Sequence, residues 1–471
     1  MRKMIILVAT ALVAVTLVGA PAQAKPKRGT PEKYVPKAGP AFNNPYGSQD
    51  AVRRLIMQVN KTVDSVPRGG KIRISAWNVR SAAITNSLIR AHQRKVSVQV
   101  VMDRANWNPN NPNRDAARLA AALKVGNKAR SKTQKSFLRR CIGSCRGKHG
   151  IPHSKFFLFN KVKVKKGKGK DAVVKTVPFV TMFGSYNATE LGATIQWNDL
   201  FTIKNDEPRY KAFLDVFQEM TQDKPIKNAY VGYDDGVIFN GFYPYVGKNV
   251  PVADPIMDAL NQVSCKGATT NASGTTRIRI AQTSMYGDRG LALARKIAQL
   301  QRQGCNIRLV YAMFGGEVLR IMRAAKVPLT HLAYDADEDG LYDRYVHMKT
   351  MAISGNFGGD PAAKITFNGS ANWTSVALAS DEVVGTVRKK WVTNRYMQWI
   401  DYMFTHRPTI WGPEHPGNNG QSPTGRVVPG SFGPLDTYAA RVAATDQYDD
   451  LVKARAKKRG VDPYALIKEE N

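Results

Sequence analysis

The chain has 471 residues, 43% of them hydrophobic, so it can bury the core of two ordinary domains, and wholesale disorder is excluded. Lysine and arginine number 70 against 36 aspartate and glutamate residues, which gives a formal net charge of +34. This excess favours a polyanionic partner, either nucleic acid or an anionic lipid surface. The alternative is a basic surface that only aids solubility.

The N-terminus has the order of a secretory signal. Two basic residues precede an apolar stretch that ends at Val18, and small residues follow up to Ala24. We therefore expect a signal peptide over residues 1–24 and a secreted, extracellular protein. No later stretch reaches the roughly 18 uninterrupted apolar residues of a membrane span. Residues 25–48 are rich in proline, glycine and lysine and are predicted to be a flexible lead-in.

Two matching series of helices and strands follow along the chain. Helical spacing of apolar residues and the alternation in KIRISAWNV predict a first series of helix, strand, helix and strand over residues 49–65, 71–79, 81–95 and 96–102. The same order returns over residues 255–263, 277–282, 291–303 and 307–312. A strand, helix, strand unit implies a parallel sheet with helices packed on it.

A short motif with a histidine and a lysine also occurs twice. IPHSKFFLFN places His153 and Lys155 two residues apart in an apolar run, and YVHMKTMAIS does the same with His347 and Lys349. In a strand, residues i and i+2 share a face, so each pair should point the same way. A single such histidine is more simply explained as a core residue, but two copies are harder to explain that way.

A Gly-Ser-x-Asn turn follows each copy. Ser185 and Asn187 lie in the first turn, and Ser370 and Asn372 lie in the second. The two histidines are separated by about 200 residues, too many for a solenoid repeat and typical of a duplicated domain. We therefore expect two half-sites to meet at a central interface.

The predicted fold is α/β, with two pseudo-symmetric halves over residues 49–229 and 255–406. Each half should contain a mixed, largely parallel sheet flanked by helices, with the active site at the interface. Residues 230–254 are predicted to be a linker, and residues 407–471 a C-terminal extension. The linker carries aromatic residues that could dip into lipid, stack on bases or pack on their own domain, namely Phe239, Phe242, Tyr243 and Tyr245.

Four cysteines in an exported chain are most simply two disulfides. Pairing Cys141 with Cys145 and Cys265 with Cys305 is favoured because each pair lies within one half. A zinc site is the alternative, because the first two cysteines and two histidines recur at every fourth position. That site would use up His153 and break its match to the second copy.

Two further stretches have open interpretations. The basic insertion from Lys161 to Val177 is either a phosphate-attracting flap or a solvated hairpin. The aspartate-rich stretch from Asp335 to Gly340 copies the start of a calcium loop, but Val346 stands where an EF-hand has glutamate. We therefore predict no metal site.

The paired motifs, each followed by Gly-Ser-x-Asn, resemble the phospholipase D superfamily, and the matching lead-ins extend the likeness over most of residues 49–406. The second copy, VHMKTMAIS followed by NGSANWTSVALASDE, is the closer match. Both copies lack the aspartate that usually ends the family motif, since Asn160 and Ser354 stand there. This departure concerns local turn geometry more than the chemistry.

The resemblance implies a role for each histidine. His153 would attack phosphorus to give a covalent phosphohistidine, and His347 would donate a proton to the leaving alkoxide. A nucleophilic imidazole needs an acceptor on its far nitrogen. Asp199 and Glu382, a short way past the two turns, are predicted to be these orienting acids.

The resemblance also implies a cradle for the phosphate oxygens. Serines in the same turns either contact phosphate or only cap the turn. No metal or other cofactor is required. The predicted cradle comprises Lys155, Lys349, Asn187 and Asn372, with Ser185 and Ser370 beside them.

Three functions remain open from the sequence. The first is a secreted, monomeric phospholipase D-type hydrolase that acts on glycerophospholipid head groups at a phospholipid surface. The second is a secreted, metal-independent nuclease of the same superfamily, with nucleic acid as the polyanion. The third is a non-catalytic polyanion-binding relative.

Overall fold

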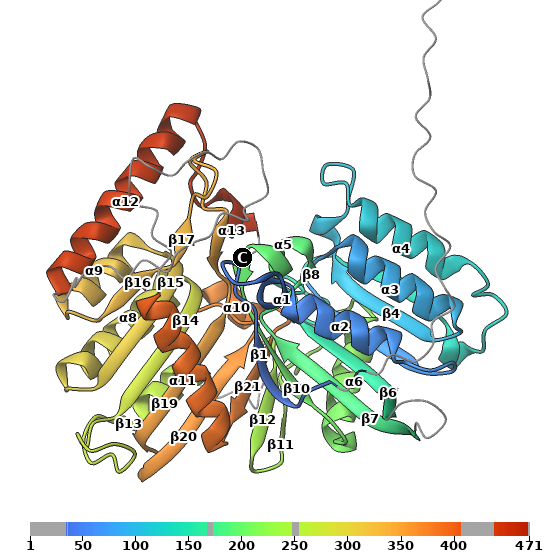
Figure 1. The fold of residues 1–471 in the computed structure, drawn as a ribbon, viewed down its shortest axis with the longest axis horizontal. Helices are drawn as coiled ribbons and strands as arrows, with labels where there is room; N and C mark the ends of the chain where they lie inside the picture. Colours follow the sequence, from blue (N-terminus) through green and yellow to red (C-terminus); the bar gives the residue numbers. More distant parts are fainter. Residues whose placement is uncertain (1–33, 35, 167–172, 247–253, 407–437, 470–471) are drawn as a thin grey trace, which may run out of the picture.

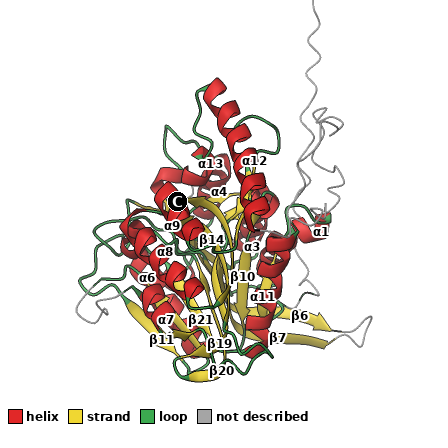
Figure 2. Cartoon of the chain, turned by 90° about the vertical axis from the view of Figure 1, so that its left-hand side faces the viewer, coloured by secondary structure: helices red, strands yellow, loops and turns green. Residues whose placement is uncertain are grey.

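The structure is a computed structural model that describes Tyr34 and residues 36–166, 173–246, 254–406 and 438–469. Two α/β halves lie side by side, the first coloured blue to green and the second yellow to orange in Figure 1. Strands occupy the centre and helices lie outside them (Figure 2). The predicted signal peptide, residues 1–24, lies outside the described residues and stays a prediction.

Seven strands form the sheet of the first half, in the order β1-β10-β7-β6-β2-β4-β5. The pairs β2–β4 and β4–β5 are parallel, and the others are antiparallel. The strands are β1 (Gly39–Phe42), β2 (Lys71–Ser75), β4 (Ser97–Asp103), β5 (Phe137–Cys141), β6 (Phe156–Lys166), β7 (Val173–Gly184) and β10 (Asp199–Ile203).

The sheet of the second half follows the path β11-β12-β21-β20-β19-β14-β15-β16, with β13 paired to β19. Its parallel pairs are β14–β15 and β15–β16. The strands are β11 (Val231–Asp234), β12 (Ile238–Phe242), β13 (Val263–Ser264), β14 (Arg277–Met285), β15 (Asn306–Phe314), β16 (Leu329–His331), β19 (Lys349–Phe357), β20 (Asp360–Gly369) and β21 (Val383–Val387).

The two sheets repeat one topology. The order β10-β7-β6-β2-β4-β5 corresponds strand by strand to β21-β20-β19-β14-β15-β16, and the parallel pairs fall at equivalent places. This confirms the prediction of a mixed α/β fold built from two pseudo-symmetric halves. The parallel part of each sheet is limited to β2-β4-β5 and β14-β15-β16, because the hairpins on the other side of each sheet pair antiparallel. One hydrophobic core contains residues of both halves, among them Phe183, Phe213, Ala352 and Val383, so the halves are packed together.

Helices cover the sheets with their apolar faces, as in α2 (Arg54–Asp64), where Leu55, Ile56, Val59 and Val63 are fully buried. The predicted helices and strands of both series are present. The other long helices are α3 (Ala82–Gln93), α4 (Arg114–Lys124), α6 (Glu207–Met220), α7 (Pro255–Asn261), α8 (Gly287–Arg302), α9 (Gly316–Ala324), α11 (Lys390–Thr405) and α12 (Tyr438–Arg459). The short ones are α1 (Gln49–Val52), α5 (Glu190–Thr194), α10 (Ser375–Ala379) and α13 (Ala465–Glu469), besides two 3-10 turns at Arg104–Asn106 and Lys132–Gln134.

Small strands connect the two halves. In a three-stranded sheet, β18 (Arg344–Val346) of the second half pairs in parallel with β9 (Gln196–Trp197) of the first half and antiparallel with β17 (Ala333–Tyr334). The strand β18 ends directly before His347, so this connection between the halves adjoins the second predicted catalytic motif. A further short pair, β3 (Val79–Arg80) with β8 (Ala188–Thr189), lies within the first half, and β8 directly follows Asn187.

Two predicted irregular segments contain strands, which corrects the sequence interpretation. Within the expected flexible lead-in, residues 39–42 form β1, because that segment pairs with the edge strand β10. Within the expected linker, β11 and β12 extend the second sheet by pairing onto β21. The linker aromatics Phe242, Tyr243 and Tyr245 are buried, so they pack within the protein and do not form an exposed lipid-dipping loop.

The disulfides join Cys141 to Cys145 and Cys265 to Cys305, as predicted. The alternative of a zinc site is therefore wrong, because it requires two thiolates where the structure has a disulfide.

Among the described residues, no helix is both long and apolar enough to cross a membrane.

The basic insertion extends the β6–β7 hairpin beyond the sheet (Figure 1). Strand β6 begins next to His153 and is 11 residues long. Its far end therefore lies roughly 30 Å from its start, since a strand rises about 3.3 Å per residue. The far end of the described hairpin therefore lies away from His153, and residues 167–172 lie outside the described residues. Both interpretations of the insertion, a phosphate-attracting flap and a solvated hairpin, stay predictions.

Candidate active site

Both histidines lie just before the strands that the sequence predicted to contain them. His153 precedes β6, which begins at Phe156, and His347 lies between β18 and β19. Each is fully buried. The two lysines fold back onto the same loops: Nζ of Lys155 donates to the carbonyl oxygen of His153 at 2.6 Å, and Nζ of Lys349 donates to that of His347 at 2.8 Å.

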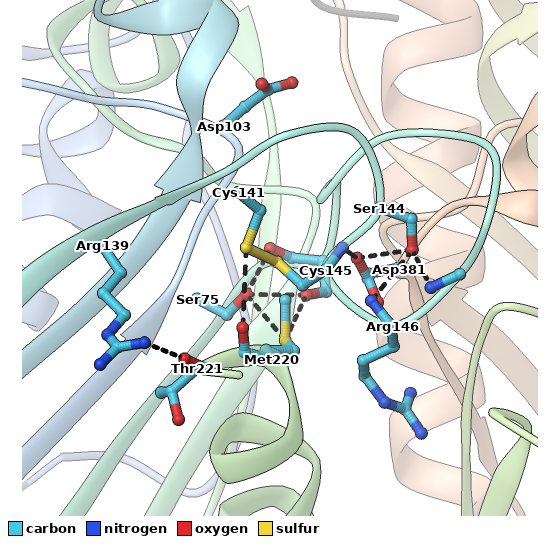
Figure 3. Close-up of a disulfide and its surroundings, with 12 residues drawn as sticks. Ser75, Asp103, Arg139, Cys141, Ser144, Cys145, Arg146, Met220, Thr221 and Asp381 are labelled. Carbon is cyan, nitrogen blue, oxygen red and sulfur yellow. Dashed lines mark hydrogen bonds between the residues drawn. A yellow bond between two sulfur atoms is a disulfide. The ribbon is translucent and has the colours of Figure 1, made fainter. Parts of the chain in front are cut away.

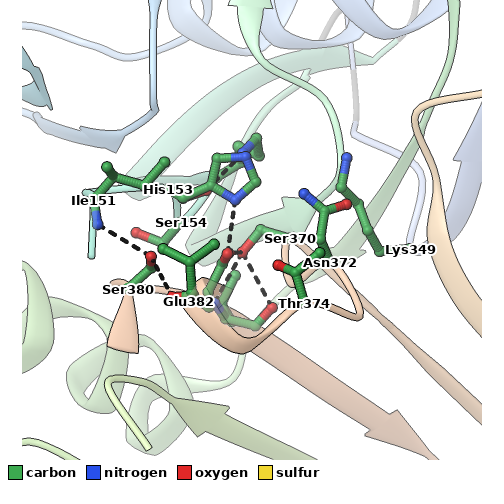
Figure 4. A network of polar contacts seen from close by, with 12 residues as sticks. Ile151, His153, Ser154, Lys349, Ser370, Asn372, Thr374, Ser380 and Glu382 are labelled. Atoms are coloured by element: carbon green, nitrogen blue, oxygen red, sulfur yellow. Dashed lines mark hydrogen bonds and ion pairs between the residues drawn. The ribbon is translucent and has the colours of Figure 1, made fainter. Parts of the chain in front are cut away.

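The first histidine is held by the second half of the chain. Nδ1 of His153 lies 2.7 Å from Oε1 of Glu382, and its backbone N–H donates to the carbonyl oxygen of Asp381 at 2.9 Å. The hydroxyl of Ser370 donates to the other carboxylate oxygen of Glu382. Figure 4 shows His153 facing Glu382, with Asn372 and Lys349 close to each other. Glu382 is therefore placed to orient His153, as predicted for one of the histidines.

The second histidine is held by the first half. Nδ1 of His347 lies 2.9 Å from Oδ1 of Asn198, and its backbone N–H donates to the carbonyl oxygen of Trp197 at 2.9 Å. The hydroxyl of Ser185 donates to the same Asn198 oxygen at 2.9 Å. The prediction of Asp199 as the orienting residue is therefore wrong by one position.

The backbone explains this correction. The N–H of Asp199 donates to the Ser185 hydroxyl at 3.0 Å, just as the N–H of Val383 donates to the Ser370 hydroxyl at 3.0 Å. Asp199 thus matches Val383, and the preceding residue, Asn198, matches Glu382. The Asp199 carboxylate lies at the contact between the halves, where it accepts hydrogen bonds from the amide of Asn368 at 3.0 Å and the hydroxyl of Tyr396 at 2.7 Å.

Asn43, which the sequence analysis did not identify, holds the backbone of Asn198 in place. Oδ1 of Asn43 accepts from the backbone N–H of Asn198 at 2.8 Å, and its amide nitrogen donates to the carbonyl oxygens of Ala193 and Gln196 at 3.0 and 2.8 Å. Asn43 lies in the segment expected to be flexible. No local signal marks it, because its partners are about 150 residues away in the chain.

A second missed residue, Asp381, joins the disulfide loop to the catalytic motif. One carboxylate oxygen of Asp381 accepts from the hydroxyl of Ser144 at 2.9 Å and from the backbone N–H of Cys145 at 2.5 Å (Figure 3). Its main chain exchanges hydrogen bonds with Ile151 and His153. The loop closed by Cys141 and Cys145 is thereby attached to the residue that precedes Glu382.

Burial and the two lysines determine the charge of the histidines. Burial is the main cause that lowers the pKa of His153 to about 4, although Glu382 acts in the opposite direction and Lys155 adds to the lowering. Burial, Lys349 and Lys155 place the pKa of His347 well below its ordinary value. Both imidazoles are therefore neutral at pH 7 before any anion is bound.

The neighbouring carboxyl groups differ from one another. Burial acts to raise the pKa of Glu382, but the interactions with His153, Lys155 and Ser370 stabilise the carboxylate, and its pKa is lowered overall. Burial raises the pKa of Asp381 to about 7, despite Arg146 and the hydrogen bonds from the disulfide loop. Glu382 is thus a permanent anion, and Asp381 titrates near neutrality.

Asn187, one of the predicted phosphate ligands, has the environment of a ligand-binding group. It is fully buried, and neither atom of its amide has a hydrogen-bond partner among the described residues. A buried amide without partners is costly unless a ligand or water satisfies it.

Asn160 and Ser354, which replace the family aspartate, lie within β6 and β19. Oδ1 of Asn160 accepts a hydrogen bond from the backbone N–H of Lys71 at 2.7 Å.

The aspartate-rich stretch is separate from this site. Ligand atoms of Asp335, Asp337 and Asp339 lie within 4.8 Å of one another. Arg455 and Arg459 of the C-terminal helix pair with Asp335 and Asp339 at 3.3 and 3.2 Å. These carboxylates therefore anchor α12 to the second half.

The fold and the paired groups define a class of protein. Two imidazoles, two ammonium groups and two amides come from equivalent places in the two halves, and each histidine is oriented by the opposite half. This set can attack a phosphodiester, hold its oxygens and protonate a leaving group. This set resembles the paired catalytic motifs of the phospholipase D superfamily.

Comparisons with known proteins agree with this class. Residues 69–221 match the family model of the cardiolipin synthase, phospholipase D-like domain. The phosphatidylserine synthase of Haemophilus influenzae has a similar structure, with a TM-score of 0.51 at 12% identity over 92% of this chain and 94% of that one. Residues 69–221 thus match a phospholipase D-like domain, and the whole chain shares its fold with the synthase.

Two other similar structures align over a smaller part of this chain than the synthase does. Nuc, a phospholipase D family member from Salmonella typhimurium, aligns at 22% identity over 39% of this chain and 95% of its own, with a TM-score of 0.26. The polyphosphate kinase of Porphyromonas gingivalis aligns at 12% identity over 87% of this chain, with a TM-score of 0.46. The match spans only 56% of the kinase. No curated protein matches the sequence.

Proposed function

We propose that this chain is a secreted phospholipase D-type hydrolase that cleaves the head-group phosphodiester of glycerophospholipids through a covalent phosphohistidine. The observation that carries the proposal is the exchange of acceptors between the halves: Glu382 orients His153, and Asn198 orients His347. A structural histidine pair has no need for two buried lysines and an unsatisfied amide beside it.

The difference between the two acceptors supports distinct roles. The carboxylate of Glu382 holds the proton on Nδ1 of His153, which leaves Nε2 as the attacking nitrogen, and stabilises the positive charge that the ring acquires on attack. Asn198 offers His347 a neutral oxygen, which stabilises an imidazolium less. His347 therefore gives up its proton more readily, as a general acid must.

The reaction proceeds in two steps, formation of the phosphohistidine and its hydrolysis. Nε2 of His153 forms a bond to phosphorus while the bond from phosphorus to the head-group oxygen breaks, and His347 transfers its proton to that oxygen. Water then attacks phosphorus, His347 takes a proton from it, and the bond between phosphorus and His153 breaks. Lys155, Lys349, Asn187 and Asn372 hold the non-bridging oxygens throughout.

Binding of the substrate anion allows His347 to take up, from solvent, the proton that it needs as a general acid. Burial and, after it, the two lysines lower the pKa of His347. A phosphodiester bound between them offsets their charge, and the pKa of His347 then rises. Protonation of the general acid is thus coupled to substrate binding.

Exposed apolar side chains near the site support a lipid substrate. Ile142 is exposed in the loop closed by Cys141 and Cys145, and Leu191 and Val376 are exposed in the short helices that follow the two turns. Such side chains can contact the interfacial region of a membrane. The nuclease alternative is supported by the net charge of +34 and the basic β6–β7 hairpin.

One experiment separates the two substrates. The mature protein is incubated in EDTA with phosphatidylcholine vesicles, with phosphatidylglycerol vesicles and with plasmid or single-stranded DNA. We expect head-group release from vesicles, reduced at least about 10⁴-fold in His153→Ala. DNA cleavage without lipid turnover supports the nuclease instead, and turnover of neither substrate supports a non-catalytic protein.

A second experiment tests which histidine is the nucleophile. With a 4-nitrophenyl phosphodiester the leaving group needs no proton, so His347→Ala can form the covalent intermediate but hydrolyses it slowly. We expect a burst of nitrophenolate and an acid-labile phosphate on His153. The matched variant, His153→Ala, should give no burst, and label found on His347 would reverse the assignment.

A further inference from the structure

A second concave site lies where β1, α2 and α11 meet, and it contains none of the catalytic residues. It is a groove of about 510 Å³ with four cationic side chains in its lining, Lys37, Arg54, Lys61 and Arg395. We call it the cationic groove. Ligand sites commonly occupy about 300–1,000 Å³, so it is large enough for a small organic molecule.

The charges of the cationic groove are not compensated. None of its four cations forms an ion pair with a carboxylate of the described residues. Other arginines nearby do: Arg53 pairs with Glu190 at 2.5 Å, and Arg90 pairs with Asp64 at 2.6 Å. Like charges gathered around a concavity repel one another and focus a positive potential into it.

The rest of the groove is apolar or aromatic. Pro40, Ala41, Phe42 and Met57 form part of its wall, and the ring of Phe42 stacks on Trp399 with centroids 5.2 Å apart. The ammonium group of Lys61 lies 5.8 Å from the ring centroid of Tyr34. The groove therefore offers an apolar surface directly beside its cations.

We propose that the cationic groove binds a phosphate-bearing ligand that also has an apolar portion. An arginine guanidinium group can donate two parallel hydrogen bonds to two oxygens of one phosphate, and lysine adds further positive charge. Arg54, Lys61 and Arg395 therefore suit a phosphate with several anionic oxygens. The apolar portion packs against Pro40 and Met57, which are partly exposed in the groove. The ligand is either the head-group region of an anionic phospholipid or a soluble organic phosphate.

Calorimetry with pyrophosphate tests the proposal in the mature protein. Pyrophosphate also fits the catalytic centre, so the readout is the number of sites. We expect two sites in the wild type and one in the triple variant Arg54→Gln, Lys61→Gln, Arg395→Gln. A control variant that loses the same charge at exposed helix and loop positions, Lys124→Gln, Arg302→Gln, Lys326→Gln, should keep both sites.

Turnover of a small soluble phosphodiester confirms that both variants are folded, because all six positions are exposed and outside the catalytic centre. A single pyrophosphate site in the wild type, or two sites in the groove variant, would overturn the proposal.

Vesicle binding distinguishes the two sources of phosphate. Cosedimentation is measured with vesicles of phosphatidylcholine alone and with added phosphatidylglycerol. If the groove holds a lipid head group, the groove variant should bind the anionic vesicles at least tenfold more weakly than the control variant. If it holds a soluble organic phosphate, the two variants should bind vesicles equally while only the groove variant lacks the second pyrophosphate site.

Discussion

The two halves of this protein have the same strand order but give their histidines different partners. In the first half the histidine faces the carboxylate of Glu382, and in the second half it faces the amide of Asn198. The serines that support these acceptors, Ser370 and Ser185, occupy equivalent turns and make equivalent bonds. The scaffold is therefore symmetric while the electrostatics are not.

This difference has a chemical consequence. A phosphodiesterase that uses two histidines needs one to be neutral and one to be charged at the start of the reaction. Two identical half-sites would have to break their symmetry at each turnover. Here a single position, Glu382 in one half and Asn198 in the other, distinguishes the two imidazoles permanently.

Removing the charge from Glu382 should have the largest effect. In Glu382→Gln the imidazole of His153 loses its anionic partner, and the nucleophile is held less well in the reactive tautomer. We expect kcat to fall by about 10²- to 10⁴-fold, by analogy with amide replacement of an orienting carboxylate in a catalytic triad. Steady-state kinetics on vesicles measures this. Glu317→Gln, at an exposed position, is the control, and a fall of less than threefold in Glu382→Gln would contradict the role.

The two disulfides offer the next comparison. Cys141→Ser/Cys145→Ser should lower kcat about tenfold, because the loop that binds Asp381 loosens beside the nucleophile. Cys265→Ser/Cys305→Ser, far along the chain from any catalytic residue, should leave kcat unchanged and lower the free energy of unfolding by about 3–4 kcal/mol. Denaturant unfolding and kinetics of both variants measure the contrast. Equal kcat in the two would show that the first loop has no positioning role.

Making the halves alike should change the pH profile. In Asn198→Asp a carboxylate faces His347 and raises its pKa, so the general acid stays protonated to higher pH. We expect the alkaline limb of the pH profile of kcat to move up by about one pH unit.

Substrate binding should also shift the pH profile of the wild type. The alkaline limb should lie at higher pH for kcat than for kcat/KM, because bound substrate raises the pKa of His347. Coincident limbs would argue against substrate-coupled protonation.

The smallest expected effect concerns stability and Asp381. Its pKa is about 7 in the folded protein, compared with about 3.9 for an unfolded chain, so the folded state binds an extra proton between these values. Stability therefore decreases as pH rises from about 4 to 7, and Asp381→Asn removes this contribution, on the order of 2–4 kcal/mol across the window. Tm measured from pH 4.5 to 8 should fall less in the variant than in the wild type. Parallel curves would exclude this assignment.

The local parts of the structure were predictable from the sequence. Apolar runs and helical spacing depend on neighbouring residues, so both strand and helix series, the two halves and the paired motifs could be predicted. Pairing of cysteines within each half was also predicted correctly. The structure brings His153 of the first half beside Glu382 of the second, and His347 of the second half beside Asn198 of the first.

The remaining parts depend on partners that are distant in the chain. The register of β10 against β7 decides that Asn198, and not Asp199, reaches His347, and a carboxylate at the neighbouring position misled the prediction. Asn43 and Asp381 act through bonds to residues about 150 and 240 positions away. Strands β1, β11 and β12 exist because edge strands were available to pair with them.

The disulfides and the contacts of the two histidines are distributed differently between the two halves. Both disulfides close within a single half, whereas the acceptor of each histidine comes from the other half. Each disulfide thus joins residues of one half only, while the partner of each histidine depends on contact between the halves. Pairing of each histidine with its acceptor therefore requires that both halves are folded and packed together.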